Sequence, residues 1–495
     1  MIYWKYEILS KKEVSKLDQY LDDMPAEIYN QYVFCKWYHD IGWFSDYYLM
    51  HRKQWSNWFI ETPDFHYEIW DLLTDEEMHD INIIIARWHW KTTALLIYML
   101  WRILYFPWWS IVYVASKNLW EKWLWKIRRE LETNKKITYI FGNIVPTNSD
   151  DTKDKRLNKW RQKELEFLNK SYIETVTRWQ PIRWSRPKEI IMDDPQDNKD
   201  VKNPRMAREF LEWSFTSLYN VLLPWGRMVA LGTIVWNLCF VKQLRDDKKW
   251  PTIEYQACDD NFENILWPDM WNKKSLMERK DWKIVKDPKT WKEMRKQGIG
   301  TAYFNQEFRN IPLNTADKTV KEEWIRYYVP PLDFDYTILA IDPATKTKER
   351  SDFTWLCVLW VKEYKKYVIY SKGVKLSPRN LEQFIININN RFEPDVIVKE
   401  DNVEVKLTDD LKARWLPIQG VWSHKDKHTR LLWVAGQIEV WDVYFLNQWQ
   451  DTVIEQITQY PDVEHDDEMD ALVIALKKAQ DRLDGENEWG WVELV

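Results

Sequence analysis

A lysine and two threonines, Lys91-Thr92-Thr93, follow a short loop that joins two apolar runs. Residues 81–86 are typical of a buried strand, and residues 94–104 have the length and spacing of a helix. A strand, a tight loop, Lys-Thr and a helix form the layout of a phosphate-binding loop. In such a loop the lysine reaches the β- and γ-phosphates, the threonine hydroxyl holds Mg²⁺, and the helix N-terminus adds N–H donors. The sequence therefore predicts a nucleotide site here.

The loop itself is Arg87-Trp88-His89-Trp90, and we count all four residues among the nucleotide-binding positions. Its two tryptophans stand where a phosphate-binding loop needs glycine, because the backbone must approach the phosphates in conformations that a Cβ disfavours. For His89 we favour a loop-filling role over that of a catalytic base.

The tryptophans in the loop are part of a wider compositional bias. The chain has 35 Trp and only 11 Gly in 495 residues, whereas glycine normally makes up about 7% of a protein. Trp108, Trp225 and Trp441 also stand where turn chemistry calls for glycine. Our hypothesis is that UGA encodes glycine in the source genome and has been translated as Trp. The alternative is a genuinely Trp-rich protein.

Two further strand ends carry groups that could act on the same nucleotide. An apolar run ends in Asp193 and Asp194, so the first acid can join the Mg²⁺ shell and the second can orient the attacking water. Residues 228–233 form another apolar run that ends in Gly232-Thr233, a place from which a hydroxyl could sense the γ-phosphate. The alternative for Thr233 is an ordinary strand end.

A second group of acids lies in the C-terminal part of the chain. Asp342 and Glu400 each end an apolar strand pattern, and Asp467 and Asp470 share one side of a C-terminal helix. Any one of these acids could be a solvated end of an element. Together and in this order they match the acid set of a ribonuclease H-like nuclease, which holds two divalent metals about 4 Å apart.

Composition restricts the class of protein. The formal charge of −6 gives no global nucleic-acid footprint, although a local basic face stays open. The four cysteines are scattered without a CxxC pair, which supports neither a zinc site nor a disulfide framework. Residues 1–12 lack the pattern of a signal peptide, and no apolar stretch reaches membrane-spanning length.

These patterns predict an α/β protein with three parts. Residues 1–60 form an N-terminal helical extension, and residues 61–325 form a P-loop ATPase domain with a mostly parallel sheet and flanking helices. Residues 335–495 form a ribonuclease H-like α/β nuclease domain. The boundary is expected around Pro330-Pro331.

Taken together, the two halves resemble the large subunit of the tailed-virus DNA-packaging terminase, over roughly residues 65 to 485. Asp194 departs from that family, where Glu is commoner, as do Trp88, Trp90, Trp179 and Trp184, where glycine is usual. The resemblance rests on Arg87 through Thr93, the acids after residue 190, Leu231-Gly232-Thr233, Phe304-Asn305-Gln306-Glu307, Asp342-Pro343, Glu400 and residues 465–472.

The resemblance implies an ATPase that translocates double-stranded DNA into a prohead and a nuclease that cuts concatemeric DNA. It implies ATP and Mg²⁺ as cofactors, with Mg²⁺ or Mn²⁺ at the nuclease site. The expected partners are DNA, a portal protein, a small terminase subunit and further copies of the chain in a ring, with no membrane. The expected location is the host cytoplasm rather than the mature virion.

The resemblance also assigns roles to several basic residues. Arg87 would contact the nucleotide phosphates. Lys427 and Arg430 would lie on DNA phosphates near the cleavage site. Arg183 or Arg186 would serve as a trans-acting arginine finger.

Three other classes of protein stay open on sequence alone. One is a P-loop helicase-like motor without a nuclease, which leaves the C-terminal acids unexplained. Another is a resolvase-like nuclease with an inactive ATPase scaffold, and the third is a non-catalytic virion component. ATP hydrolysis and metal-dependent cutting of a plasmid distinguish between them.

Overall fold

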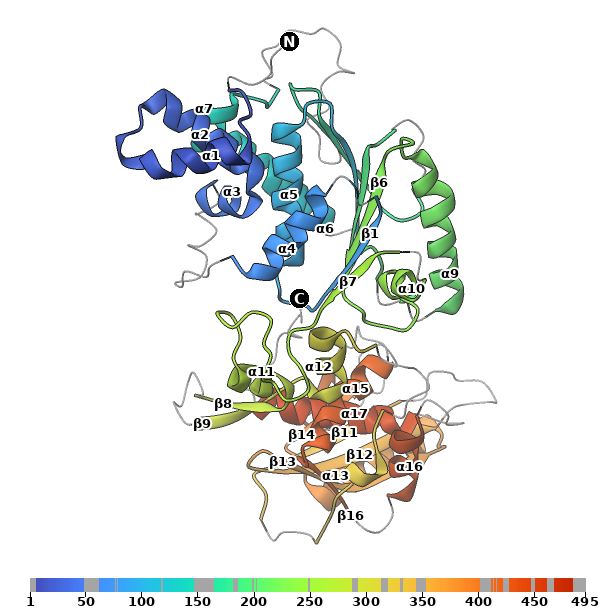
Figure 1. The fold of residues 1–495 in the computed structure, drawn as a ribbon. Coiled ribbons are helices and arrows are strands. Elements are labelled where there is room, and N and C mark those ends of the chain that lie inside the picture. The colour runs from blue at the N-terminus through green and yellow to red at the C-terminus, as the bar shows by residue number, and fades with distance from the viewer. Residues whose placement is uncertain are drawn as a thin grey trace. The chain divides into compact units, whose positions relative to one another are not determined.

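A computed structural model of the chain shows two compact units, Met1–Asn272 with Gln306–Pro312, and Lys273–Asn305 with Leu313–Val495 (Figure 1). The structure describes residues 6–48, 62–75, 77, 79–116, 119–146, 164–180, 186–197, 200–201, 203–247, 250–286, 293–312, 319–329, 333–343, 353–400, 411–412, 414, 416–421, 427–446, 450–460 and 467–483.

The first unit is built on a seven-stranded sheet of order β3-β4-β2-β5-β6-β1-β7. All neighbouring strands are parallel except β3 and β4. The central strands are buried along their whole length, as expected for a parallel sheet covered on both faces. The strands are β1 (Ile81–Ile85), β2 (Ser110–Ala115), β3 (Glu164–Glu166), β4 (Tyr172–Val176), β5 (Glu189–Asp193), β6 (Arg227–Gly232) and β7 (Thr252–Tyr255).

Helices cover both faces of this sheet. Helices α4, α5 and α6 lie on one face, and α9 and α10 lie on the other (Figure 1). The helices are α1 (Lys11–Leu17), α2 (Ala26–His39), α3 (Ile41–Tyr48), α4 (Asp64–Thr74), α5 (Lys91–Tyr105), α6 (Leu119–Thr133), α7 (Lys135–Phe141), α9 (Pro204–Trp213) and α10 (Phe240–Asp246), with short helical turns at Asp18–Asp23 and Ser214–Val221.

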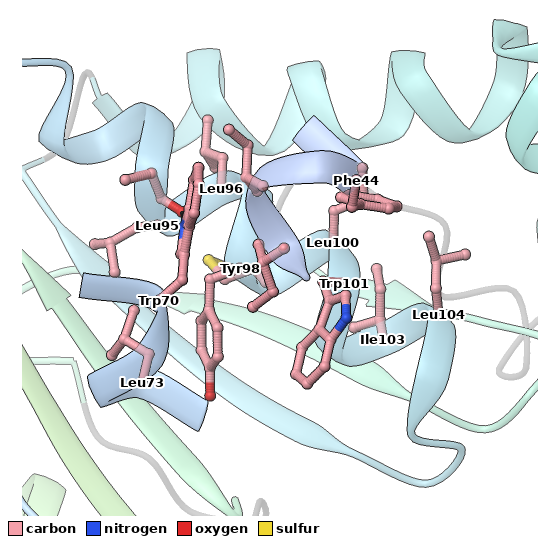
Figure 2. Packing of buried hydrophobic residues seen from close by; sticks show 14 of the residues in the cluster. Phe44, Trp70, Leu73, Leu95, Leu96, Tyr98, Leu100, Trp101, Ile103 and Leu104 are labelled. Atoms are coloured by element: carbon pink, nitrogen blue, oxygen red, sulfur yellow. Dashed lines mark hydrogen bonds between the residues drawn. The ribbon is translucent and has the colours of Figure 1, made fainter. Parts of the chain in front are cut away.

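Helix α5 is the centre of the core, because its residues are buried on every side from Ala94 to Tyr105. Figure 2 shows Trp70 of α4 and Phe44 of α3 packed around it. The N-terminal helices therefore share one hydrophobic core with the predicted ATPase fold: the Trp101 indole N–H donates to the Trp37 carbonyl at 3.0 Å.

The second unit contains a mixed seven-stranded sheet of order β10-β16-β13-β12-β11-β14-β15. Strands β11, β12 and β13 are antiparallel neighbours, and β14 continues the sheet in parallel to β11. The strands are β10 (Tyr327–Tyr328), β11 (Tyr336–Asp342), β12 (Thr354–Lys362), β13 (Lys365–Val374), β14 (Val396–Glu400), β15 (Ile418–Val421) and β16 (Val443–Leu446).

The helices of the second unit also cover both faces of its sheet. Helix α13 packs on one face, and α15, α16 and α17 pack on the other. No helix among the described residues is both long and apolar enough to cross a membrane. The remaining elements are α11 (Lys273–Lys280), β8 (Trp282–Lys286), β9 (Glu293–Gln297), α12 (Gly300–Arg309), the turn Glu322–Trp324, α13 (Pro378–Phe392), α15 (Lys427–Glu439), α16 (Asp451–Gln459) and α17 (Asp467–Leu483).

The α/β class and the mostly parallel first sheet are confirmed. The division between units differs from the expected boundary near Pro330-Pro331, because residues 273–305 belong to the second unit. The reason is local packing: a Cβ on Gly436 would lie 2.9 Å from the Gly300 Cα, and the Thr301 N–H donates to the Glu439 carboxylate at 3.1 Å. A sequence pattern of charged helices gives no hint of such a close helix contact.

Candidate nucleotide site and acidic site

The strand order of the first unit brings three functional strand ends together. Strand β6 lies between β1 and β5, with Ile84 beside Gly232 and Leu231 beside Asp193. Because the carboxyl ends of parallel strands meet at one edge of a sheet, Lys91, Thr233 and the β5 acids share that edge. The sheet therefore assembles a site from motifs that are far apart in the sequence.

Lys91 connects these strand ends. Its Nζ donates to the Thr233 hydroxyl at 2.7 Å and lies 2.5 Å from Asp194 Oδ2. The Thr233 N–H donates in turn to Asp194 Oδ1 at 3.2 Å. Lys91 is only 7% exposed, and a buried ammonium is stable only with such partners. The Lys91 ammonium is thus fixed at this edge of the sheet, where a phosphate could bind it together with Thr233 and Asp194.

Gly232 is required at this edge by its surroundings. A Cβ at this position would lie 2.9 Å from a Val241 methyl group and 3.3 Å from Asp194 Oδ1. The small residue before Thr233 therefore allows the β5 acids and β6 to pack closely.

Asp193 provides the second half of the site. The Thr92 hydroxyl donates to its Oδ1 at 3.2 Å, and the Tyr113 hydroxyl donates to its Oδ2 at 2.8 Å. Burial and the neighbouring charge of Asp194 raise the pKa of Asp193 to about 6, against the opposing effects of Lys91 and the two hydroxyls. A hydroxyl and a carboxylate in contact are the hard oxygen donors that Mg²⁺ prefers. The donor set therefore fits a magnesium ion.

The loop backbone does not suit the residues that it carries. Trp88 has φ 68° and Trp90 has φ 52° with a left-handed conformation, which costs a non-glycine residue about 1–2 kcal/mol. Both indoles are about two-fifths exposed, and the Trp90 ring lies 5.0 Å from the Trp267 ring. The Thr92 and Asp193 oxygens fit the Mg²⁺ of a nucleotide. The two indoles, however, belong to loop positions whose backbone N–H groups would have to approach the phosphates.

The same mismatch recurs elsewhere in the chain. Among the described residues, eleven non-glycine residues have positive φ, and five of them are tryptophans. Each of these five is exposed by two-fifths or more. They are Trp88, Trp90, Trp108, Trp179 and Trp441, all of which the sequence marks as glycine-like positions.

Other tryptophans are ordinary core residues. Trp37, Trp70, Trp101 and Trp267 are at most 3% exposed, and the Trp70 indole N–H donates to the Ala94 carbonyl at 3.0 Å. The chain thus contains two structurally different populations of tryptophan.

Arg87 is partly exposed and His89 is buried, and both contact other groups of the first unit. Arg87 Nε lies 2.7 Å from Glu307 Oε2, and its backbone N–H donates to the Glu307 carbonyl at 2.7 Å. His89 is fully buried, with Nδ1 2.7 Å from the Arg87 carbonyl, and the His66 Nε2 lies 2.9 Å from the His89 carbonyl. Burial lowers the pKa of both histidines to about 4, so they are neutral near pH 7. His89 therefore fills the loop.

Thr93 and the two candidate finger arginines have less defined surroundings. Thr93 is partly exposed in the first turn of α5, and Arg186 is exposed just before β5. Arg183 lies outside the described residues. The choice between the two arginines stays a prediction.

The sheet of the second unit also brings two strand ends that carry acids next to each other. Strand β11 is parallel to β14, with Ile341 beside Lys399, so the next positions along the two strands are Asp342 and Glu400. Helix α17, which begins at Asp467, packs on β11. The backbone therefore brings the strand-end acids side by side; the side chains of Glu400, Asp467 and Lys427 lie outside the described residues.

Asp470 and Arg430 form a buried ion pair. Arg430 Nη2 lies 3.1 Å from Asp470 Oδ1, and both side chains are about one-eighth exposed. The sequence predicts Asp470 as a metal ligand and the resemblance implies Arg430 on DNA; the structure shows the two side chains in contact, and both roles stay predictions. Among the described side chains, no three acids, histidines or cysteines converge on one point.

Sequence reasoning missed two site residues. Tyr113 lies in an apolar strand, where nothing marks it until the order β2-β5 places it beside Asp193. Glu307 is part of a motif in the sequence, but the motif does not reveal that its carboxylate contacts Arg87 Nε at 2.7 Å.

Comparisons with protein-family models and with curated proteins give no match. Among solved structures, the large terminase from a thermophilic bacteriophage is 9% identical over 84% of this chain and 98% of its own, with a TM-score of 0.49. The HK97 bacteriophage large terminase is 11% identical over 85% and 95%, with a TM-score of 0.33.

A third solved structure covers one part of the chain. The large terminase nuclease from thermophilic phage G20c with bound magnesium is 14% identical over 32% of this chain and 93% of its own, with a TM-score of 0.25. The first two of these structures, both large terminases of bacteriophages, align with most of this chain, and the third aligns with about a third of it.

Proposed function

We propose that this chain is the large subunit of a viral DNA-packaging terminase. The observation that supports it most is the presence in one chain of two sites at strand ends. One joins Lys91, Thr233 and Asp194 by direct contacts, and the other places Asp342 beside Glu400. A motor needs the first site and a nuclease needs the second, and a packaging enzyme needs both.

The first site would hydrolyse ATP. Lys91 would bind the β- and γ-phosphates, and Thr92 with Asp193 would hold Mg²⁺, which neutralises the charge of the transferred phosphoryl group. Asp194 would orient the attacking water once a phosphate takes its place beside Lys91. Thr233, hydrogen-bonded to Lys91, would transmit the state of the phosphate to β6.

The second site would cut DNA. Asp342, Glu400 and Asp467 would hold Mg²⁺ or Mn²⁺, which lowers the pKa of a bound water and stabilises the leaving oxygen. Arg430 would keep Asp470 and the start of α17 in position through their ion pair. The strand-end placement of the acids gives a rigid support for such a metal site.

In its biological setting, the protein would act in the host cytoplasm as a ring of copies on a portal protein. A small terminase subunit would deliver double-stranded DNA, the first unit would drive translocation into the prohead, and the second would cut the concatemer.

The decisive experiment is a packaging reaction with purified proheads, ATP and DNA, scored by DNA protected from added nuclease. ATP hydrolysis and Mg²⁺- or Mn²⁺-dependent plasmid cutting are measured on the same protein with glycine at positions 88 and 90. ATP hydrolysis without cutting would favour a helicase-like motor, and cutting without hydrolysis would favour a resolvase-like nuclease. Neither activity would indicate a non-catalytic component.

A further inference from the structure

A compact stretch of the second unit has a charge opposite to that of the whole chain. The described residues 273–286 and 293–297, which we name the basic module, contain eight lysines and arginines against three acids. This is a net charge of +5 in a chain of −6, so the rest of the protein is strongly acidic. Such local clustering is the electrostatic footprint of a polyanion site.

The basic module is a separate structural element. It consists of α11 and the antiparallel pair β8 and β9, a two-stranded sheet outside the seven-stranded sheet of its unit. Helix α11 packs on β8, and β9 contacts α17 (Figure 1). Because a hairpin of two strands is marginally stable alone, these contacts must hold it in place.

Several lysines of the module lie at the surface, Lys273, Lys274 and Lys283 among them. Lys274 lies 3.8 Å from Glu278, and Lys280 lies 3.5 Å from Asp281, but exposed pairs of this kind contribute about 0–1 kcal/mol. Lys283 is exposed without an ion-pair partner among the described residues. The strand register also pairs its position with Lys296, and like charges at paired positions destabilise a sheet.

The hairpin also exposes apolar surface. Trp282 is 41% exposed and Ile284 is 53% exposed, and residues two apart on a strand share one face. The module therefore combines exposed lysines with a partly exposed apolar face.

We infer that the basic module binds the phosphate backbone of double-stranded DNA; the choice of duplex DNA rests on the proposed function. Lysines that neutralise phosphates release counterions and bind independently of base sequence, which suits an enzyme that handles a whole genome. Helix α17 contacts this hairpin and carries Asp467 and Asp470 in its first turn. The module therefore holds DNA on the unit that would cut it.

The test compares two triple variants of the full chain in duplex-DNA binding. The first changes three exposed lysines of the module, Lys273→Gln, Lys274→Gln and Lys283→Gln. The matched control changes three lysines of α1, Lys11→Gln, Lys12→Gln and Lys16→Gln, with the same loss of charge. Fluorescence anisotropy with a labelled duplex is read over a salt series, with EDTA and without nucleotide, so that neither activity is needed.

Each lost phosphate contact reduces the slope of log K against log salt by about 0.9. The module variant should therefore lose up to about 2.7 in slope, whereas the control variant should keep the slope of the parent protein. Equal slopes in all three proteins, or no duplex binding by the parent, would overturn the inference. A single-stranded competitor that displaces the duplex at equal phosphate concentration would also count against it.

The two proposals can fail separately. If the module variant loses binding in a parent that neither hydrolyses ATP nor cuts DNA, the inference stands and the proposed function does not. If the parent hydrolyses ATP and cuts DNA but the module variant binds like the parent, the proposed function stands and the module is not its DNA contact.

Discussion

Lys91 Nζ lies 2.5 Å from Asp194 Oδ2, so the lysine of the phosphate-binding loop is neutralised by the second acid of the β5 motif. A nucleotide phosphate must compete with this carboxylate for the ammonium. The contact links phosphate binding to the release of Asp194, the residue that would orient water, because a phosphate and the Asp194 carboxylate repel each other beside one ammonium.

The ion pair of Lys91 with Asp194 predicts that ATP binding and ATP hydrolysis respond differently to mutation of these residues. With glycine at 88 and 90, Asp194→Asn should hold ATP at least as tightly as the parent, because a competing charge is removed. It should reduce turnover at least about a hundredfold, the scale of losing one electrostatic stabiliser. Lys91→Ala and Asp193→Ala should show the same loss of turnover, and Lys91→Ala should also weaken binding. Unchanged turnover in these variants would eliminate this site.

The acids of the second unit lie in a different unit from the nucleotide site, which predicts that nuclease activity does not depend on ATP hydrolysis. Asp342→Asn would remove one of the proposed metal ligands at the end of β11, so plasmid cutting should be abolished while ATP hydrolysis stays near the parent rate. Calorimetric titration with Mn²⁺ should show weaker binding as well, which reports on the site without requiring catalysis. Retained cutting by this variant would refute the metal-site assignment. Asp481→Asn is a suitable control, because Asp481 lies in the last turns of α17, whereas Asp467 and Asp470 lie in its first turn.

The buried histidine pair predicts a loss of stability in mild acid. Burial holds the pKa of His66 at about 4 in the folded protein, below the value of about 6.5 for an unfolded chain. The unfolded state therefore binds more protons between these values, and stability falls as pH drops from 6.5 toward 4. The loss is on the order of 3 kcal/mol per histidine.

This pH dependence can be isolated with one substitution. His66→Gln places an amide N–H where the His66 Nε2 faces the His89 carbonyl, but it cannot be protonated in this range. Urea unfolding of the parent should weaken more than that of the variant between pH 6.5 and 4.5. Since carboxylates titrate in both proteins alike, parallel curves would mean that His66 is not the group responsible.

The strand ends of the first unit could be predicted from sequence because they follow a simple geometric rule. Lys91, Asp193 and Thr233 each end or follow an apolar strand, and the carboxyl ends of parallel strands meet. The contact of Lys91 with Asp194 depends on side-chain rotamers and on the left-handed backbone of Asp194, which no pattern reveals.

Contacts that depend on tertiary packing could not be predicted from the sequence. Tyr113 resembles any other residue of a buried strand, and its role comes only from the place of β2 beside β5. Arg430 looks like a surface cation in sequence, yet it is buried on Asp470 through the packing of α15 on α17. Residue types and their order can be read from the sequence, whereas these partners are fixed by the order of strands in the sheet and by the packing of helices.

The two populations of tryptophan lead to the last prediction. A left-handed position favours glycine, and five exposed tryptophans occupy such positions. Core tryptophans such as Trp70 instead fill space and donate a hydrogen bond. If UGA encodes glycine in the source genome, the gene should have UGA at codons 88, 90, 108, 179 and 441 and UGG at codons 37, 70 and 101. UGG at both codon 88 and codon 90 would contradict the hypothesis.

The protein itself provides the functional half of this test. Trp88→Gly with Trp90→Gly removes two strained residues, about 1–2 kcal/mol each, and frees the space that backbone N–H groups need around a β-phosphate. Calorimetric titration with a non-hydrolysable ATP analogue should show binding by this variant and none by the chain with both tryptophans. The matched control, Trp70→Gly, should instead destabilise the fold by at least about 3–5 kcal/mol, because it empties a buried site. Tight binding by the unchanged loop would show that phosphates are accommodated beside both indoles, and that the glycine requirement does not apply here.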